Sequence, residues 1–287
     1  MTATTLIGQV RRRSRWIAAL LVGALLLGAG AATLDDQQRR WIFQASIAYG
    51  RSGPNDAAGM QDVWIAYQAG DGSVKLHGLW DANADPDAPV LLFLHGARRT
   101  VGGSAFRIRH MRDLGFSVLA VDYRGFGRST DELPSQARAD EDAHAAWHWL
   151  AERYPGRDRY IFGHSLGGAI AVQLASEVSD AKGLIVEGAF PSIAAVFQTF
   201  RFGWLPITPL ITQRFEAGDY IARVKAPVLV VHGALDRLIP PRLGRALFDR
   251  ATSPKRFVLI EDGNHYTTNG LGQTQYRKAL HDLFGWP

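Results

Sequence analysis

The feature that most constrains this chain is the pattern Gly-x-Ser-x-Gly at residues 163–167. An apolar run at residues 159–162 precedes it, and a segment of helical character at residues 166–178 follows it. A strand that turns directly into a helix leaves the serine on a tight, strained turn, where only glycine fits at the flanking positions. Such a turn pushes the hydroxyl of Ser165 out over the sheet and places it at a helix N-terminus, whose dipole favours an oxyanion. The pattern therefore predicts that Ser165 is a nucleophile.

Strands and helices alternate along the body of the chain from residue 61 onward. Asp71-Gly72 marks a hairpin turn between the first two strands. The alternation predicts an α/β fold with a mostly parallel sheet and helices on both faces, in which ligands bind at the carboxyl ends of the strands. The expected strands are residues 63–67, 74–79, 90–94, 117–121, 159–162, 184–186, 228–231 and 257–260. The expected helices are residues 105–114, 136–153, 166–178, 242–250 and 273–284.

Two polar residues that could assist the serine follow later strands, in the chain order serine, acid, histidine that such a turn predicts. They are Asp236 and His265, each in a loop after a predicted strand. We expect His265 to take the proton of Ser165 and return it to the leaving group, while Asp236 orients the imidazole and stabilises its cation. Glu187, which also follows a strand, competes for the acid role. The longer loop that carries Asp236 favours Asp236.

An oxyanion hole needs two backbone N–H groups, one of which belongs to the residue after the nucleophile, here Leu166. The other comes from the loop after an early strand, and the N–H of Ala97 is the candidate there. Arg98 and Arg99 come next. These two arginines either select an anionic substrate or form a solvated turn.

Residues 16–34 carry no charge and are rich in Leu, Ala and Gly, and a membrane-spanning helix needs about 20 residues. A basic tail at residues 1–15 precedes them and places the N-terminus in the cytoplasm by the positive-inside rule. We expect a transmembrane signal-anchor with the catalytic domain outside the cytoplasm. The alternative is export after cleavage of a signal peptide at Ala29-Gly30-Ala31. Residues 35–60 are then a juxtamembrane linker, whose segment 38–49 lies on the membrane as an amphipathic helix or packs against the domain.

Composition excludes several other functions. The sequence has no cysteine, which excludes disulfides, zinc ribbons, iron–sulfur sites and thiol nucleophiles. No His and carboxylate residues have zinc-ligand spacing, so we expect no metal. Four arginines in residues 1–34 reduce the formal net charge of +5 to +1 for the remainder. Nucleic-acid binding requires a basic stripe on the folded surface, so we expect no nucleic-acid partner.

Several motifs together resemble those of the α/β-hydrolase superfamily, most of all its membrane-anchored, short-lid branch of Bem-type, ABHD-type and serine aminopeptidase-like proteins. The matching segments are residues 94–96, 122–129, 163–168, 232–236 and 262–265. The resemblance implies the α/β-hydrolase fold with an eight-stranded sheet, a Ser-His-Asp triad, hydrolysis of esters or thioesters, and no cofactor. It places a hydrolase domain at residues 61–287 with a short lid at about residues 189–226.

The expected lid is apolar and acid-poor, which is typical of a segment that roofs an acyl-binding pocket, dips into a bilayer or packs on the core. Phe197, Phe200, Phe202 and Trp204 are too close together for all of them to face one way on a helix. The leading hypothesis is a membrane-associated serine hydrolase that acts on small-molecule acyl esters or thioesters. The alternatives are an aminopeptidase-like serine peptidase, which the acid-poor lid disfavours, and a non-catalytic membrane-anchored binding protein. The intact serine, acid and histidine disfavour the latter.

Overall fold

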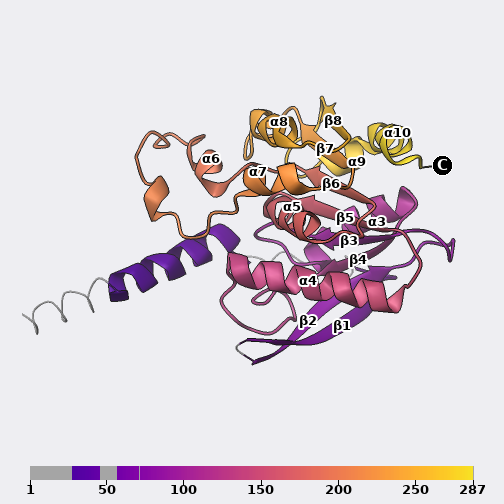
Figure 1. Cartoon of the computed structure of the whole chain (residues 1–287), viewed down its shortest axis with the longest axis horizontal. Coiled ribbons are helices and arrows are strands. Elements are labelled where there is room, and N and C mark those ends of the chain that lie inside the picture. Colours follow the sequence, from indigo (N-terminus) through magenta and orange to yellow (C-terminus); the bar gives the residue numbers. More distant parts are fainter. Residues whose placement is uncertain (1–27, 46–56, 71, 287) are drawn as a thin grey trace, which may run out of the picture.

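The computed structural model of this chain describes residues 28–45, 57–70 and 72–286. Within them one sheet of eight strands has the order β1-β2-β4-β3-β5-β6-β7-β8 (Figure 1). The first two pairs, β1 with β2 and β2 with β4, are antiparallel, and all later pairs are parallel. The strands are β1 (Gln61–Ala69), β2 (Gly72–Asp81), β3 (Val90–Leu94), β4 (Ser117–Val121), β5 (Arg159–His164), β6 (Gly183–Glu187), β7 (Val228–Gly233) and β8 (Lys255–Ile260). The predicted α/β-hydrolase fold, with its mostly parallel eight-stranded sheet, is confirmed.

Helices cover both faces of the sheet. One face carries α4 (Gln136–Arg153), α5 (Leu166–Glu177) and α8 (Pro241–Arg250), and the other carries α3 (Ala105–Asp113) and α10 (Gln273–Phe284). The central strand β3 serves both cores, because Leu92 and Leu94 pack on the first face while Leu91 and Phe93 pack on the second. A continuous apolar run is what a parallel strand buried on both faces requires. The carboxyl ends of the parallel strands therefore meet at one rim, where the loops of interest lie.

Most predicted bounds agree with the structure, and the differences occur where apolar patterning is weak. The strands β3 and β4 and the helices α4 and α10 have the expected bounds. The hairpin of β1 and β2 is longer than expected, since Gln61 pairs with Trp80 and Ala69 pairs with Gly72. One face of this hairpin is exposed, so polar residues extend the strands beyond their apolar centres. The short helix α9 (Thr268–Leu271) was not predicted.

The segment expected as the lid, residues 189–226, has little regular structure. It contains α6 (Ile193–Phe197), η2 (Thr208–Leu210), α7 (Ala217–Tyr220) and η3 (Ile221–Arg223). Its outer part forms a loop that extends from the body beyond the carboxyl ends of the strands (Figure 1). We refer to residues 189–226 as the lid.

Residues 28–43 form a helix, here called the N-terminal helix, that projects from the body on the same side as the lid and contacts the body through its C-terminal part (Figure 1). Phe43 at its end is fully buried against Phe126 and Phe215. The described part of the segment 38–49 thus packs on the domain, as one of the two alternatives predicted. Most of the expected membrane span, residues 16–27, and the linker residues 46–56 lie outside the described residues. In the part that is described, no helix has both the length and the apolar character needed to cross a membrane.

Candidate active site

Ser165 occupies the turn between β5 and α5 in a conformation that few residues adopt, with φ 56° and ψ −123°. In this turn the backbone passes so close to neighbouring backbone that only glycine fits at positions 163 and 167. A Cβ atom on Gly163 would lie 2.3 Å from the carbonyl oxygen of Gly167, and one on Gly167 would lie 2.1 Å from that of Leu94. The backbone N–H of Ser165 donates to the carbonyl of Glu187 on the neighbouring strand. These contacts hold a strained residue in place and direct its hydroxyl away from the sheet.

Three side chains from separate loops form one hydrogen-bonded chain at the rim of the sheet. The hydroxyl Oγ of Ser165 lies 3.0 Å from Nε2 of His265, and Nδ1 of His265 lies 2.7 Å from Oδ2 of Asp236. The other oxygen of Asp236 accepts the backbone N–H groups of Leu238 and Ile239 at 3.0 and 2.8 Å. The structure thus brings together the three residues that the sequence singled out.

The environment of Asp236 keeps it ionised. Burial by itself would raise the pKa of this carboxyl, but the hydrogen bonds with His232 and His265 outweigh burial and lower it. The backbone N–H of Ile239 acts in the same direction. An ionised carboxylate fixes a proton on Nδ1 of the imidazole, which leaves Nε2 free to accept the serine proton. Gly188 lies beside this pair, and a Cβ there would be 3.3 Å from Nδ1 of His265.

The loop after β3 lies directly against the serine. A Cβ on Gly96 would be 3.0 Å from Cβ of Ser165, so this loop and the turn that carries Ser165 are in contact. Ala97 and Leu166 both line the cavity in front of the hydroxyl. Over the described residues, no acceptor is bonded to the N–H of Ala97. Leu166 is the first residue of α5, where a backbone N–H has no partner within the helix. Both groups are therefore available as donors.

Glu187, the competing acid, does not contact the imidazole of His265. Its carboxylate accepts from Nε of Arg107 at 3.1 Å and from the hydroxyl of Tyr276 at 2.5 Å. Arg107 is completely buried and also donates to the backbone carbonyl of His265 at 3.1 Å. It lies 2.9 Å from Nε2 of His164, whose pKa is lowered well below its ordinary value by burial and by the charge of Arg107. This network behind His265 is a part of the site that the sequence reasoning missed.

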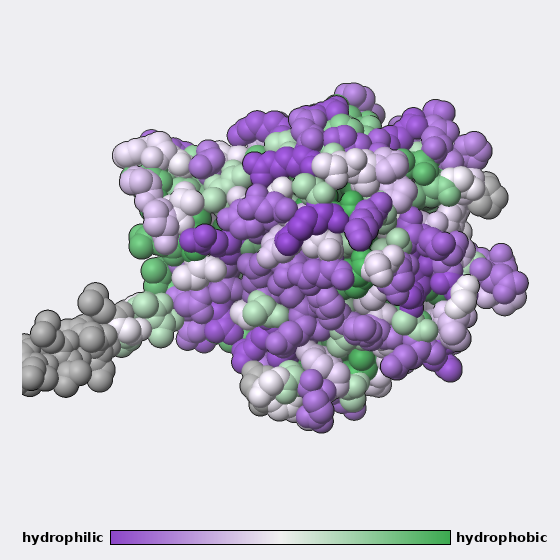
Figure 2. Space-filling model, in the orientation of Figure 1, coloured by the Kyte–Doolittle hydropathy of each residue, from purple (hydrophilic) through white to green (hydrophobic). Residues whose placement is uncertain are grey.

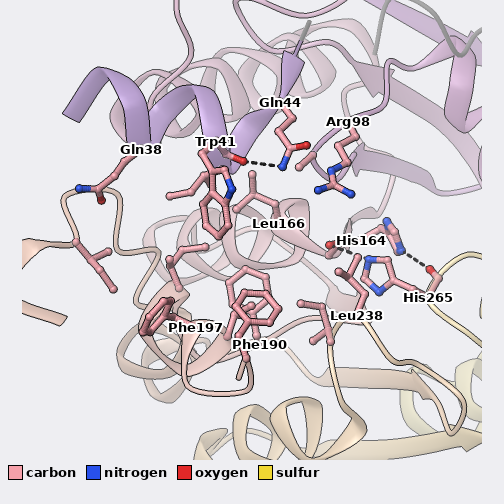
Figure 3. Close-up of a pocket in the computed structure, with 18 of the residues that line it drawn as sticks. Gln38, Trp41, Gln44, Arg98, His164, Leu166, Phe190, Phe197, Leu238 and His265 are labelled. Atoms are coloured by element: carbon pink, nitrogen blue, oxygen red, sulfur yellow. Dashed lines mark hydrogen bonds between the residues drawn. The ribbon is translucent and has the colours of Figure 1, made fainter. Parts of the chain in front are cut away.

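A cavity of about 380 Å³ opens in front of Ser165. Its walls come from the lid, from the loops after β3, β5, β7 and β8, and from the N-terminal helix (Figure 3). The apolar and aromatic lining residues are Leu34, Trp41, Ile42, Ala97, Leu166, Phe190, Ile193, Val196, Phe197, Phe200, Ile207, Leu210, Ile211, Leu238, Ile239 and Tyr266. The polar ones are Gln38, Gln44, Arg98, Arg99, His164, Ser165 and His265. None of these described lining residues is acidic, so the cavity suits a largely apolar, uncharged or anionic molecule.

The aromatic residues of the lid divide into two sets, as their spacing predicted. Phe197 and Phe200 line the cavity, whereas Phe202 and Trp204 do not and are 58% and 77% exposed. Hydrophobic residues gather on the molecular surface where the lid and the N-terminal helix meet (Figure 2).

The two arginines after Ala97 also differ from each other. Arg99 donates to the carbonyl of Gly103 and lies over the ring of Tyr266 at 5.1 Å, which fixes its position. Arg98 points its guanidinium toward the cavity (Figure 3).

Comparisons with known proteins give consistent relationships. The family model described as serine aminopeptidase, S33, matches residues 85–221. An uncharacterized protein of Mycobacterium tuberculosis is 31% identical over 258 residues, which are 88% of this chain and 89% of that protein. The lysophosphatidylserine lipase ABHD12 of Danio rerio is 28% identical over 67% of this chain and 56% of its own length.

Solved structures share the fold at lower sequence identity. The esterase Pf2001 of Pyrococcus furiosus has a TM-score of 0.65 at 21% identity, with 81% of this chain and 96% of that chain covered. Est1E of Butyrivibrio proteoclasticus has a TM-score of 0.64 at 19% identity, with 78% and 99% covered. The serine aminopeptidase family model, the lipase relative and the mycobacterial relative that matches nearly the whole of both chains agree with the shared eight-stranded fold. This chain therefore belongs to the α/β-hydrolase superfamily.

Proposed function

We propose that this hydrolase cleaves carboxylic ester or thioester bonds of acyl compounds, with Ser165 as nucleophile, His265 as general base and acid, and Asp236 as the residue that orients the imidazole. The observation that carries the proposal is the hydrogen-bonded chain of these three side chains at the mouth of an apolar cavity. Nucleophile and base lie within hydrogen-bond reach and the base is oriented by a third group, which is the arrangement that activates a serine.

The reaction follows from this arrangement. The Oγ atom of Ser165 attacks the acyl carbonyl carbon while its proton passes to Nε2 of His265. The N–H groups of Ala97 and Leu166 donate to the oxyanion that forms, and each such donor is worth about 3–4 kcal/mol of barrier. His265 then protonates the departing alcohol or thiol, which leaves an acyl group on Ser165. Water, deprotonated by the same imidazole, releases the acid and restores the serine.

The lining of the cavity favours an acyl ester over a peptide with a free amino terminus. An aminopeptidase must bind the cationic amine of its substrate, for which a carboxylate in the site is the natural partner. The described lining residues include two arginines and no carboxylate. The name of the zebrafish relative, a lysophosphatidylserine lipase, is consistent with an amphiphilic acyl substrate. We therefore propose acyl esters as the substrate class and keep peptides as the alternative.

A fluorophosphonate probe tests the proposal, because it reacts with an activated serine whatever the natural substrate. We expect the wild-type chain to be labelled and Ser165→Ala to remain unlabelled. We also expect Ser165→Ala to lower kcat on p-nitrophenyl octanoate by about 10⁵-fold. Ser176→Ala, on the outer part of α5, is the matched control and keeps both properties. Labelling that persists in Ser165→Ala rejects Ser165 as the nucleophile. Faster cleavage of aminoacyl p-nitroanilides than of esters selects the peptidase alternative.

We also propose that the N-terminal segment anchors the chain in a membrane with the hydrolase domain outside the cytoplasm. The apolar residues 16–34 after a basic tail support this location. Since the sequence has no cysteine, Ser73→Cys provides a single label site at the exposed start of β2. We expect a membrane-impermeant maleimide to label it in intact cells, and the product to remain in the membrane fraction. Labelling only after lysis rejects the orientation, and a soluble labelled product selects the cleaved signal peptide.

A further inference from the structure

The N-terminal helix presents one continuous face to the cavity. Leu34, Gln38, Trp41 and Ile42 all line it, and their spacing of four, seven and eight residues places them on the same side of a helix. Figure 3 shows Trp41 directed from this helix toward Phe197 of the lid, with the cavity between them. The neighbouring Gln37 is exposed and is not among the residues that line the cavity.

The helix is fixed to the lid by paired hydrogen bonds. The side-chain amide of Gln38 donates to the carbonyl of Leu210 at 2.7 Å and accepts the N–H of Thr212 at 2.9 Å. One turn earlier, Asp35 accepts from the side-chain amide of Gln213 at 2.8 Å. These contacts join segments more than 170 residues apart. They hold the outer lid in a defined position over the cavity.

The other side of the helix is fixed to the body. Arg39 donates from Nε to the carbonyl of Pro134 at 2.9 Å, and Phe43 is buried in the core. The carbonyl of Phe43 accepts the N–H of Arg98 at 3.1 Å, the residue that follows Ala97. The helix is therefore a positioned wall that contacts the lid, the core and the loop beside Ser165.

We propose that the N-terminal helix forms the acyl-chain subsite of this hydrolase: Trp41 and Ile42 contact the distal methylenes of a medium or long unbranched acyl chain, and Gln38 holds the lid over it. This inference rests on the proposed esterase function. It assigns chain-length selectivity to a segment that lies outside the strand–helix body of the fold. The apolar lining and the absence of a carboxylate among the described lining residues fit an alkyl chain.

Kinetics on two esters of the full chain test the proposal. We expect Trp41→Ala and Gln38→Ala to raise KM for p-nitrophenyl octanoate by about four- to fifteen-fold, the factor to which one or two lost methylene contacts correspond. Hydrolysis of p-nitrophenyl acetate stays within about twofold, since acetate does not reach the helix. Gln37→Ala and Trp64→Ala, on the exposed face of the helix and on β1, are the matched controls and change neither ester. Equal losses on both esters, or no loss on octanoate, overturn the proposal.

Binding gives a readout that does not depend on turnover. In the full chain with Ser165→Ala, 11-bromoundecanoate carries a bromine atom at the end of its chain, where it quenches a tryptophan that it contacts. We expect the quenchable fluorescence to fall when Trp41→Phe is added and to stay unchanged when Trp64→Phe is added. If the wild-type protein hydrolyses neither ester, the esterase proposal fails. The quenching experiment alone then decides whether Trp41 contacts the end of the acyl chain. Quenching that is the same with and without Trp41 rejects the helix as the subsite.

Discussion

The loops around Ser165 and the lid across the cavity hold their residues by different means. Ser165, Asp236 and His265 each directly follow a strand or the turn after it, and their side chains are fixed by hydrogen bonds of 2.7–3.0 Å. The lid contains only short helical turns joined by irregular segments, and it exposes several large hydrophobic residues. It is hydrogen-bonded to Gln38 of the N-terminal helix, which lies more than 170 residues away in the sequence. We propose that the loops at the rim of the sheet determine which bond is cleaved, whereas the lid and the N-terminal helix determine which molecule is accepted.

The largest expected effect comes from separate substitutions of Asp236 and Glu187, the two candidate acids. We expect Asp236→Asn to lower kcat by about 10⁴-fold, because the amide favours the wrong imidazole tautomer. Glu187→Gln leaves kcat within about tenfold but destabilises the fold by about 3 kcal/mol, since it leaves the charge of Arg107 buried without its partner. Ester kinetics and urea unfolding of both variants measure the two effects. The reverse ranking in kcat assigns the acid role to Glu187.

Substitutions in the lid affect selectivity more than chemistry. We expect Phe197→Ser to lower kcat/KM for p-nitrophenyl octanoate by about tenfold while leaving the acetate ester within about twofold, because the lost contacts are with methylenes. Phe202→Ser is the internal control, since Phe202 lies outside the cavity lining and is exposed. If both variants lose activity on both esters, the lid positions the catalytic loops, and the division between the two regions is wrong.

The buried network around His164 makes stability depend on pH. The folded protein holds this imidazole neutral, since burial and the charge of Arg107 lower its pKa, whereas the unfolded chain binds a proton below about pH 6.5. The unfolded state therefore binds more protons, and the unfolding free energy falls with decreasing pH, by up to about 1.4 kcal/mol for each pH unit below 6.5. We expect urea titrations between pH 7 and 5 to show a smaller slope for His164→Asn than for wild type. An unchanged slope contradicts the conclusion that the folded protein holds His164 neutral.

The smallest expected effect concerns the rim of the cavity. Arg98 lines the cavity that contains the serine, so we expect it to attract an anionic leaving group, whereas an arginine in a solvated turn would not discriminate between charged and uncharged leaving groups. We expect Arg98→Gln to lower the ratio of kcat/KM for 3-carboxy-4-nitrophenyl octanoate to that for 4-nitrophenyl octanoate by about threefold. Arg98→Lys keeps the ratio, and added salt reduces it in wild type. A ratio that is the same in all three proteins identifies the loop as a solvated turn.

The sequence predicted the strand-end site well because each element of it is local. Gly163 and Gly167 are adjacent to Ser165, and the apolar strand β5 precedes them, so short-range sterics determine the turn. Asp236 and His265 were found from their position after strands and their order in the chain. The same reasoning could not decide what Glu187 binds, because its partners Arg107 and Tyr276 are 80 and 89 residues away.

The N-terminal helix and the lid show where local patterns become insufficient. The residues from Leu34 to Phe43 have the periodicity of an amphipathic helix, but periodicity does not say whether a membrane or a protein covers the apolar face. The structure covers Phe43 with Phe126 and Phe215, a contact between three distant segments. Gln38 and Asp35 could have indicated that protein covers this helix, because they are polar residues on the side that meets the lid.

The strand order also bears on when the three residues of the proposed triad come together during synthesis. Asp236 and His265 follow β7 and β8, the last two strands along the chain and the outermost two at one edge of the sheet. A growing chain can pair β1 to β6 and place Ser165 on its turn while it still lacks both partners of the serine. The end of the chain then packs Trp286 against Phe116, at 4.4 Å between ring centroids. Under the proposed mechanism, a growing chain that has not yet reached His265 cannot carry out the reaction, although the strand and helix that flank Ser165 have already been synthesised.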